Sequence, residues 1–214
     1  MTTRFDSGCV AERLETPVVE RAAVVVCGGG PAGIAAAIGA ARAQRRLGIT
    51  PDVRLIETHG QLGGVWTSGL LSWILDARNK SGLITEIIQA AERYRAERGG
   101  GPTIAFGHAY DPEQMKLLLE TLCADAGVRV RLHTSVVAAQ REGNRLGRIM
   151  TESKSGREAF EGACFIDCTG DGDLAARAGC DFEFGLADPD QPGQVKRQPM
   201  TLLGIVTGVD PELV

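Results

Sequence analysis

Three glycines at a fixed spacing carry the clearest chemical signal in the sequence. Gly28, Gly30 and Gly33 form the pattern G-x-G-x-x-G, which follows an apolar run at 22–27 and precedes an alanine-rich stretch at 32–46. A strand, this turn and a helix in that order bind the diphosphate of a dinucleotide, because free N–H groups and the positive end of the helix dipole face the phosphates. The sequence therefore predicts a dinucleotide site.

Each residue of this turn has a separate task in the predicted site. Gly28 permits the tight turn, Gly30 lets the backbone approach the diphosphate, and Gly33 lets the helix pack closely on the strand. Pro31 and Ala32 occupy the start of the helix and are therefore expected beside the phosphates.

An acidic residue is expected where the second strand ends. Glu57 closes the stretch 52–57 and lies 24 residues after Gly33, slightly later than is usual, which a longer connection at 45–52 accommodates. A carboxylate at this place accepts a hydrogen bond from a ribose 2′-hydroxyl and repels a 2′-phosphate, so NADP is disfavoured. The alternative interpretation is a glycine-rich turn followed by a surface glutamate.

Two further glycine turns favour FAD over NAD. The stretch 60–64 follows Glu57 almost directly and includes Gly63 and Gly64. The stretch 169–173 follows an apolar strand at 163–168, at the sheet edge where ligands bind. The alternatives for the turn at 169–173 are a calcium loop and a simple helix start capped by Asp173. The ligand series of an EF-hand is absent.

The expected elements alternate between strands and helices. The order strand, helix, strand over 22–57 predicts a parallel sheet with a right-handed crossover. Further helices are expected at 81–97 and 111–127, the latter with Asp111 as N-cap and Pro112 in the first position. The remaining strands are expected at 128–133, 136–140, 145–151, near 158–160, at 163–168 and over 200–209, with a loop at 187–199. The fold class is α/β, a Rossmann-like FAD/NAD(P)-binding parallel sheet with an inserted small antiparallel β-meander.

Four stretches together resemble a known family. VVVCGGGPAGIAAAIGAAR, LIETHGQLGG, SKSGR and FIDCTGDGDLAARAG are similar to segments of FAD-dependent oxidoreductases of the glutathione reductase structural class. The sequence is most similar to the broad bacterial FAD-oxidoreductase type, and it is distantly similar to fumarate reductase flavoproteins and thiazole-synthase-like proteins. The resemblance runs from about residue 18 to the last residue.

The resemblance implies non-covalently bound FAD and assigns residues to it. Gly28, Gly30, Gly33 and Gly64 would lie near the pyrophosphate, and Glu57 would bind the adenosine ribose. The backbone of Val136 would lie beside the adenine, and Thr169, Gly170 and Asp171 would close over the cofactor.

The expected function is an oxidoreductase that transfers hydride or electrons between a small organic substrate and the flavin. The sequence identifies no catalytic residue and no metal site. The alternatives are a non-catalytic flavin- or nucleotide-binding subunit that needs a partner chain, and an NAD-dependent dehydrogenase. Family members are longer and supply a later glycine-rich segment around the flavin. We therefore expect a missing C-terminal portion or a partner chain to complete the site.

Composition and segment boundaries limit the remaining possibilities. Hydrophobic residues make up 43% of the chain, charged residues make up 23%, and the net charge of −4 gives no bias toward nucleic acid. No apolar run approaches the roughly 20 residues of a membrane span, and no secretory signal is evident, so a cytoplasmic protein is expected. We expect an N-terminal extension at 1–20, an FAD-binding domain at 21–185 with the meander near 134–161, and at 186–214 the start of a substrate or cap domain that is truncated.

Overall fold

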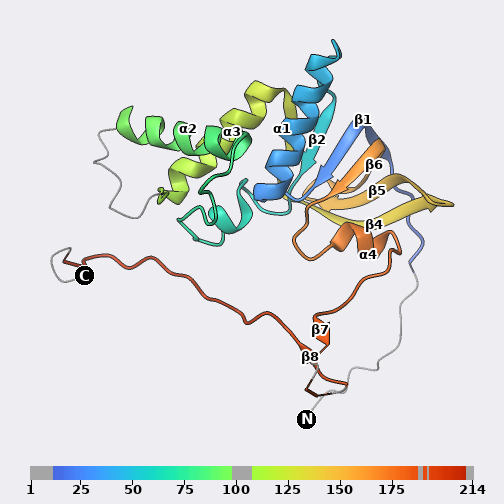
Figure 1. Ribbon diagram of the computed structural model, residues 1–214. Coiled ribbons are helices and arrows are strands. Elements are labelled where there is room, and N and C mark those ends of the chain that lie inside the picture. The colour runs from blue at the N-terminus through green and yellow to red at the C-terminus, as the bar shows by residue number, and fades with distance from the viewer. Residues whose placement is uncertain (1–11, 98–107, 188–189, 192, 211–214) are drawn as a thin grey trace.

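The computed structural model describes residues 12–97, 108–187, 190–191 and 193–210 and shows an α/β fold (Figure 1). A six-stranded sheet has the strand order β3-β2-β1-β6-β5-β4. Neighbours among β3, β2, β1 and β6 are parallel, whereas β5 pairs antiparallel with both β6 and β4. The strands are β1 (Val18–Cys27), β2 (Val53–Ile56), β3 (Val128–Arg131), β4 (Thr134–Glu142), β5 (Arg145–Ser153) and β6 (Gly156–Asp167). The predicted fold class is confirmed. None of the described helices is both long and apolar enough to cross a membrane.

Two apolar clusters lie on opposite faces of the sheet, because side chains along a strand alternate in direction. Val26 of β1 belongs to the larger cluster, together with the buried sides of α1 (Pro31–Arg46), α2 (Leu83–Glu97) and α3 (Pro112–Ala126). Its neighbours Val25 and Cys27 belong to the smaller cluster, which includes Leu174 of α4 (Asp173–Arg177). The parallel strands are therefore covered on both faces near their carboxyl ends.

The ends of α3 follow the expected capping chemistry. The Asp111 side chain accepts a hydrogen bond from the backbone N–H of Glu113 at 2.8 Å, and Pro112 occupies the first turn. Gly127 ends the helix with a φ of 78°, a left-handed conformation that glycine adopts without strain. Both predicted ends of this helix are confirmed.

One long strand replaces two expected short ones. The predicted strands near 158–160 and at 163–168 are parts of a single 12-residue strand, β6. Its first half pairs antiparallel with β5, and Ala159 to Asp167 pair parallel with β1. Gly162 does not interrupt the strand, since the space beside it is filled by Phe165, whose Cζ would lie 2.8 Å from an added Cβ. The meander is therefore continuous with the parallel sheet.

The C-terminal part also differs from the prediction. A two-stranded hairpin of β7 (Leu186–Ala187) and β8 (Val195–Lys196) stands where a loop was expected at 187–199. The expected strand at 200–209 does not form, because no described segment pairs with it. This stretch runs as an extended chain away from the sheet (Figure 1). Its large apolar side chains are exposed, fully so at Met200 and nearly so at Leu202.

A bidentate ion pair joins α1 to α2. Arg42 donates through both terminal nitrogens to the two carboxylate oxygens of Glu86, at 2.8 and 2.6 Å. The hydrogen bonds from Arg42 lower the pKa of Glu86 below its ordinary value of 4.5. The charged form of Glu86 is therefore favoured in the folded state.

We expect this ion pair to make the free energy of unfolding depend on pH in the acidic range. A carboxyl whose pKa is lowered by folding contributes stability above pH 4.5, and that contribution is lost as the pH falls through the lowered value. Glu86→Gln should remove less than about 1 kcal/mol at pH 7, because water screens exposed pairs. Urea titrations at neutral and acidic pH measure the effect, with Glu92→Gln on the same helix as control. An equal loss from Glu86→Gln at both pH values would contradict the prediction.

Candidate dinucleotide-binding site

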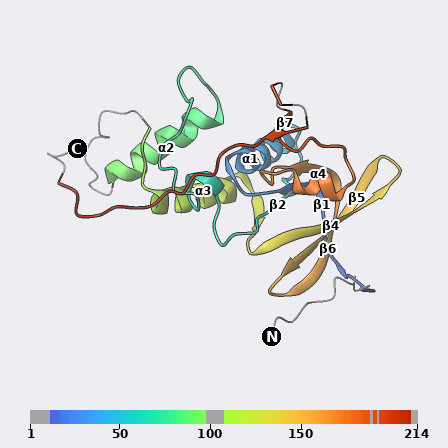
Figure 2. The same ribbon diagram turned by 90° about the horizontal axis from the view of Figure 1, so that it is seen from below.

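A cavity of about 910 Å³ opens at the carboxyl ends of β1, β2 and β6. It is larger than two other cavities in the described part of the chain, of about 370 and 30 Å³. The starts of α1 and α4 border it, and the view from below shows both helices near the end of β1 (Figure 2). Ligands of α/β proteins bind at this edge of the sheet.

The first glycine turn forms one wall, and its three motif glycines are used differently. Gly28 has a φ of 101°, and a Cβ there would overlap the backbone carbonyl of Cys168. A Cβ on Gly33 would overlap the carbonyl oxygen of Gly28, so this glycine lets α1 pack on the turn. A Cβ on Gly30 would meet no atom within 4 Å. The space beside Gly30 therefore belongs to the cavity.

The second glycine turn is tied to the first. The N–H of Gly63 donates to the carbonyl oxygen of Gly29 at 2.8 Å. Gly64 follows and lines the cavity, where a Cβ would lie 3.0 Å from the Cα of Gly30. Gly63 thus holds the two turns together, and Gly64 forms the wall.

The carboxylate of Glu57 lies on the floor of the cavity with the residue only 6% exposed. One oxygen accepts the N–H of Gly29 at 2.5 Å. The other accepts the backbone N–H of His59 at 2.7 Å and lies 2.8 Å from its ring Nδ1. Glu57 is therefore held in place by the glycine turn on one side and by His59 on the other.

A third turn, after β6, is built around Asp167. Its Oδ1 accepts hydrogen bonds from the N–H and hydroxyl of Thr169, and its Oδ2 accepts from the N–H of Ala175 at 2.8 Å. The Thr169 hydroxyl accepts from the N–H of Asp173 at 2.7 Å. The expected N-cap role of Asp173 is wrong. Gly172 is the N-cap, and the side chains of Thr169 and Asp167 accept from two N–H groups of the first turn of α4, those of Asp173 and Ala175.

Nine of the twelve residues predicted to bind the cofactor line this one cavity. They are Gly28, Gly30, Pro31, Ala32, Glu57, Gly64, Val136, Thr169 and Gly170. Gly33 and Gly63 lie behind the wall, where they set its shape. Asp171 is exposed on the third turn and does not line the cavity.

Several polar lining residues were not singled out from the sequence. Asp167 is the last residue of β6, and Glu57 comes directly after β2. Both acidic residues therefore lie at the carboxyl ends of parallel strands, and this shared position was the signal in the sequence that could have identified Asp167. Arg177 lies four residues after Asp173 and donates to its carboxylate at 2.7 Å, a helical spacing. The other missed polar residues are Thr58, His59, Thr134, Ser135 and Cys168.

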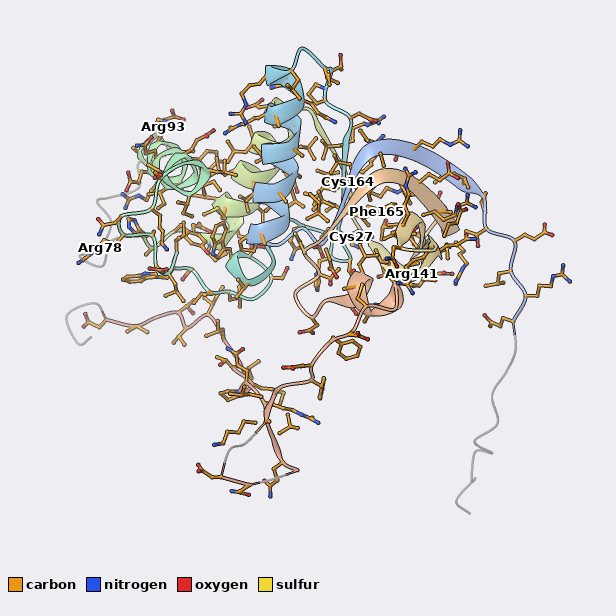
Figure 3. The ribbon with its side chains drawn as sticks, turned by 45° about the vertical axis from the view of Figure 1, so that its right-hand side comes forward. Cys27, Arg78, Arg93, Arg141, Cys164 and Phe165 are labelled. Carbon is orange, nitrogen blue, oxygen red and sulfur yellow. The ribbon has the colours of Figure 1, made fainter. Side chains whose placement is uncertain are left out.

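The two cysteines beside the cavity are neutral thiols. Burial raises the pKa of Cys27 to about 12, and it also raises the pKa of Cys168. Cys27 lies at the end of β1, beside the first glycine turn (Figure 3). Because the thiolate is the reactive form, neither residue is suited to nucleophilic chemistry near neutral pH.

Comparisons with known proteins agree with this geometry. A family model described as FAD dependent oxidoreductase matches residues 23–213. No curated protein matches the chain.

Several solved structures share the fold. L-proline dehydrogenase from P. horikoshii is 13% identical with a TM-score of 0.52, covering 77% of this chain and 57% of that one. The aromatic hydroxylase CabE, from angucycline biosynthesis, is 21% identical with a TM-score of 0.53, covering 78% and 35%. The myxobacterial chondrochloren halogenase CndH, a variant of FAD-dependent halogenases, is 18% identical with a TM-score of 0.50, covering 70% and 37%. The chain therefore spans less than two thirds of each of these proteins.

Proposed function

The chain belongs to the FAD dependent oxidoreductase family, whose cofactor is FAD, and we propose that its cavity binds FAD for hydride or electron transfer with a small organic substrate. The open space beside Gly30 carries the proposal. This space lies at the start of α1, where N–H groups without helical partners face outward. We assign the diphosphate of FAD to this space.

The residues assigned to the cofactor divide between its parts. Nine of them line the cavity, while Gly33 and Gly63 lie behind its wall. The carboxylate of Glu57 accepts a hydrogen bond from the adenosine ribose, and the backbone of Val136 lies beside the adenine. Thr169 and Gly170 close over the ligand from the third turn, and Asp171 is exposed beside them. The diphosphate is surrounded by the first two turns, whose residues are Gly28, Gly30, Pro31, Ala32, Gly33, Gly63 and Gly64.

The flavin supplies the electron transfer when it is bound. The chain's own residues bind the adenosine and diphosphate and fix their orientation. The catalytic residues that face the substrate belong outside this set, because the cavity described here holds the adenosine and diphosphate end.

We further propose an extension at 1–20, the FAD-binding domain at 21–185, and the start of a substrate or cap domain at 186–214. The boundary at 20 falls inside β1, which begins at Val18. The exposed apolar side chains of 200–209 support the last assignment, because a group of exposed apolar side chains marks a surface that contacts another part of a protein. The activity of the whole protein then requires a further segment or a partner chain to complete the flavin end.

The visible absorption spectrum of the purified chain tests the cofactor assignment. After addition of FAD and desalting, we expect a retained flavin spectrum with the vibrational structure of a bound isoalloxazine. Reduction by candidate donors then tests the oxidoreductase activity. A colourless protein that binds NADH in a fluorescence titration would contradict the proposal.

A further inference from the structure

His59 is the one imidazole among the described residues that line the cavity, and it contacts the carboxylate assigned to the ribose. We propose that His59 is a positioning residue: it orients Glu57, and its protonation raises the affinity for FAD. This inference rests on the proposed function, because it concerns the same site.

The contact between the two side chains is specific. Oε1 of Glu57 receives the backbone N–H of His59 and also faces its Nδ1, at 2.7 and 2.8 Å. The Glu57 side chain is 8% exposed, whereas the His59 side chain is 62% exposed. The carboxylate is therefore almost enclosed, and the ring that holds it remains in contact with water.

The backbone around both residues is fixed independently of a ligand. The N–H of Glu57 donates to the carbonyl of Arg131, and its carbonyl accepts from Thr134, both at 2.9 Å. The carbonyl of His59 accepts from the N–H of His133 at 3.0 Å. Gly60 then packs against the His133 ring, whose Cε1 would lie 2.6 Å from an added Cβ. The His59 ring therefore faces Glu57 before any cofactor arrives.

The hydrogen bond determines which ring nitrogen of His59 carries a proton toward Glu57. An ionised carboxylate only accepts hydrogen bonds, so Nδ1 of His59 must carry a proton in both charge states of the ring. Protonation then occurs at Nε2. Glu57 stays oriented throughout, and the change is the addition of one positive charge at the cavity wall.

The balance of charge in the cavity gives the sign of the effect. The carboxylates of Glu57, Asp167 and Asp173 line it together with Arg177, which already donates to Asp173. The His133 ring, under Gly60, is the other titratable group packed against the His59 loop. FAD brings two negative charges in its diphosphate. Protonating His59 therefore favours binding, by about three- to tenfold for charges separated by several ångströms in a partly hydrated site.

The test measures the FAD dissociation constant by flavin fluorescence between about pH 6 and pH 8, where imidazoles change charge. The wild-type chain should bind more tightly at the lower pH. His59→Asn should bind at the wild-type high-pH level without pH dependence, because its amide donates to Glu57 but does not titrate. His59→Ala should bind about tenfold more weakly throughout, as expected for losing a hydrogen bond to a charged group.

His133→Asn is the matched control, since asparagine tolerates the left-handed φ of 51° at this position. It should keep the wild-type pH dependence. A His59→Asn chain that retains the pH dependence would overturn the inference, as would a His59→Ala chain with unchanged affinity.

A measurement without FAD separates this inference from the proposed function. Nitrogen-15 NMR of the imidazole should show Nδ1 of His59 protonated across this pH range, and the preference should disappear in Glu57→Leu, which has no acceptor. An unprotonated Nδ1 would overturn the positioning role. A protonated Nδ1 in a chain that binds no FAD would support the contact, overturn the pH coupling and contradict the cofactor assignment.

Discussion

Replacing Gly30 with valine is expected to abolish FAD binding while leaving the fold intact. A Cβ at this position meets no protein atom within 4 Å, so the side chain would occupy the part of the cavity proposed for the diphosphate. The backbone of Gly30, with φ of −72° and ψ of −176°, is extended, which valine adopts readily and which suits a residue before proline. We expect FAD affinity to fall at least about 100-fold, or about 2.7 kcal/mol.

Two measurements on Gly30→Val separate binding from folding. Flavin fluorescence gives the affinity, and urea unfolding without FAD gives the stability, which should change by less than about 1 kcal/mol through the weaker N-cap. Gly30→Ala, with a smaller side chain, should lie between valine and wild type in affinity. Wild-type FAD affinity in Gly30→Val would mean that the diphosphate does not bind at the start of α1, and it would refute the assignment.

Gly33→Ala, three residues later, is expected to destabilise the fold itself. The added Cβ would overlap the carbonyl oxygen of Gly28 and lie 3.3 Å from the Cβ of Cys168. The backbone of Gly28 cannot move aside as a flexible side chain could, so α1 must shift away from the turn. We expect a loss of at least about 3 kcal/mol in the free energy of unfolding, at the upper end of the range for overpacked sites.

Gly39→Ala provides the matched control for this substitution. Gly39 is on the same helix, and a Cβ there meets no atom within 4 Å. Alanine at this exposed position should stabilise the chain by about 0.5–1 kcal/mol, because glycine is a poor helix former. Urea denaturation of both variants without FAD makes the comparison, and equal effects at the two positions would show that close packing does not explain Gly33.

Local patterns in the sequence were sufficient where structure depends on neighbouring residues. The strand, glycine turn and helix over 22–46 were predicted because each element has its own composition and period. The ends of α3 were predicted from Asp111, Pro112 and Gly127, whose capping chemistry is confined to one turn. These elements place most of the predicted cavity residues together at the ends of β1, β2 and β6.

The sequence was misleading where pairing between distant segments decides the outcome. Two strands were expected, near 158–160 and at 163–168, yet Phe165 fills the space beside Gly162 and β6 continues through it. The stretch 200–209 has strand-forming residues, but propensity cannot supply a partner strand. Arg177 reaches the cavity only because α4 folds back beside the glycine turn, and no local pattern contains that information.

The central position of β6 has a consequence for synthesis of the protein on the ribosome. Arg21 and Glu161, paired between β1 and β6, are 140 residues apart in the chain. At about 5–20 residues per second, β1 must wait on the order of ten seconds for this neighbour. During that time one edge of an apolar strand stays unpaired, which is the state that chaperones protect from aggregation. The nascent chain therefore completes the cavity at the ends of β1, β2 and β6 only after the meander has emerged.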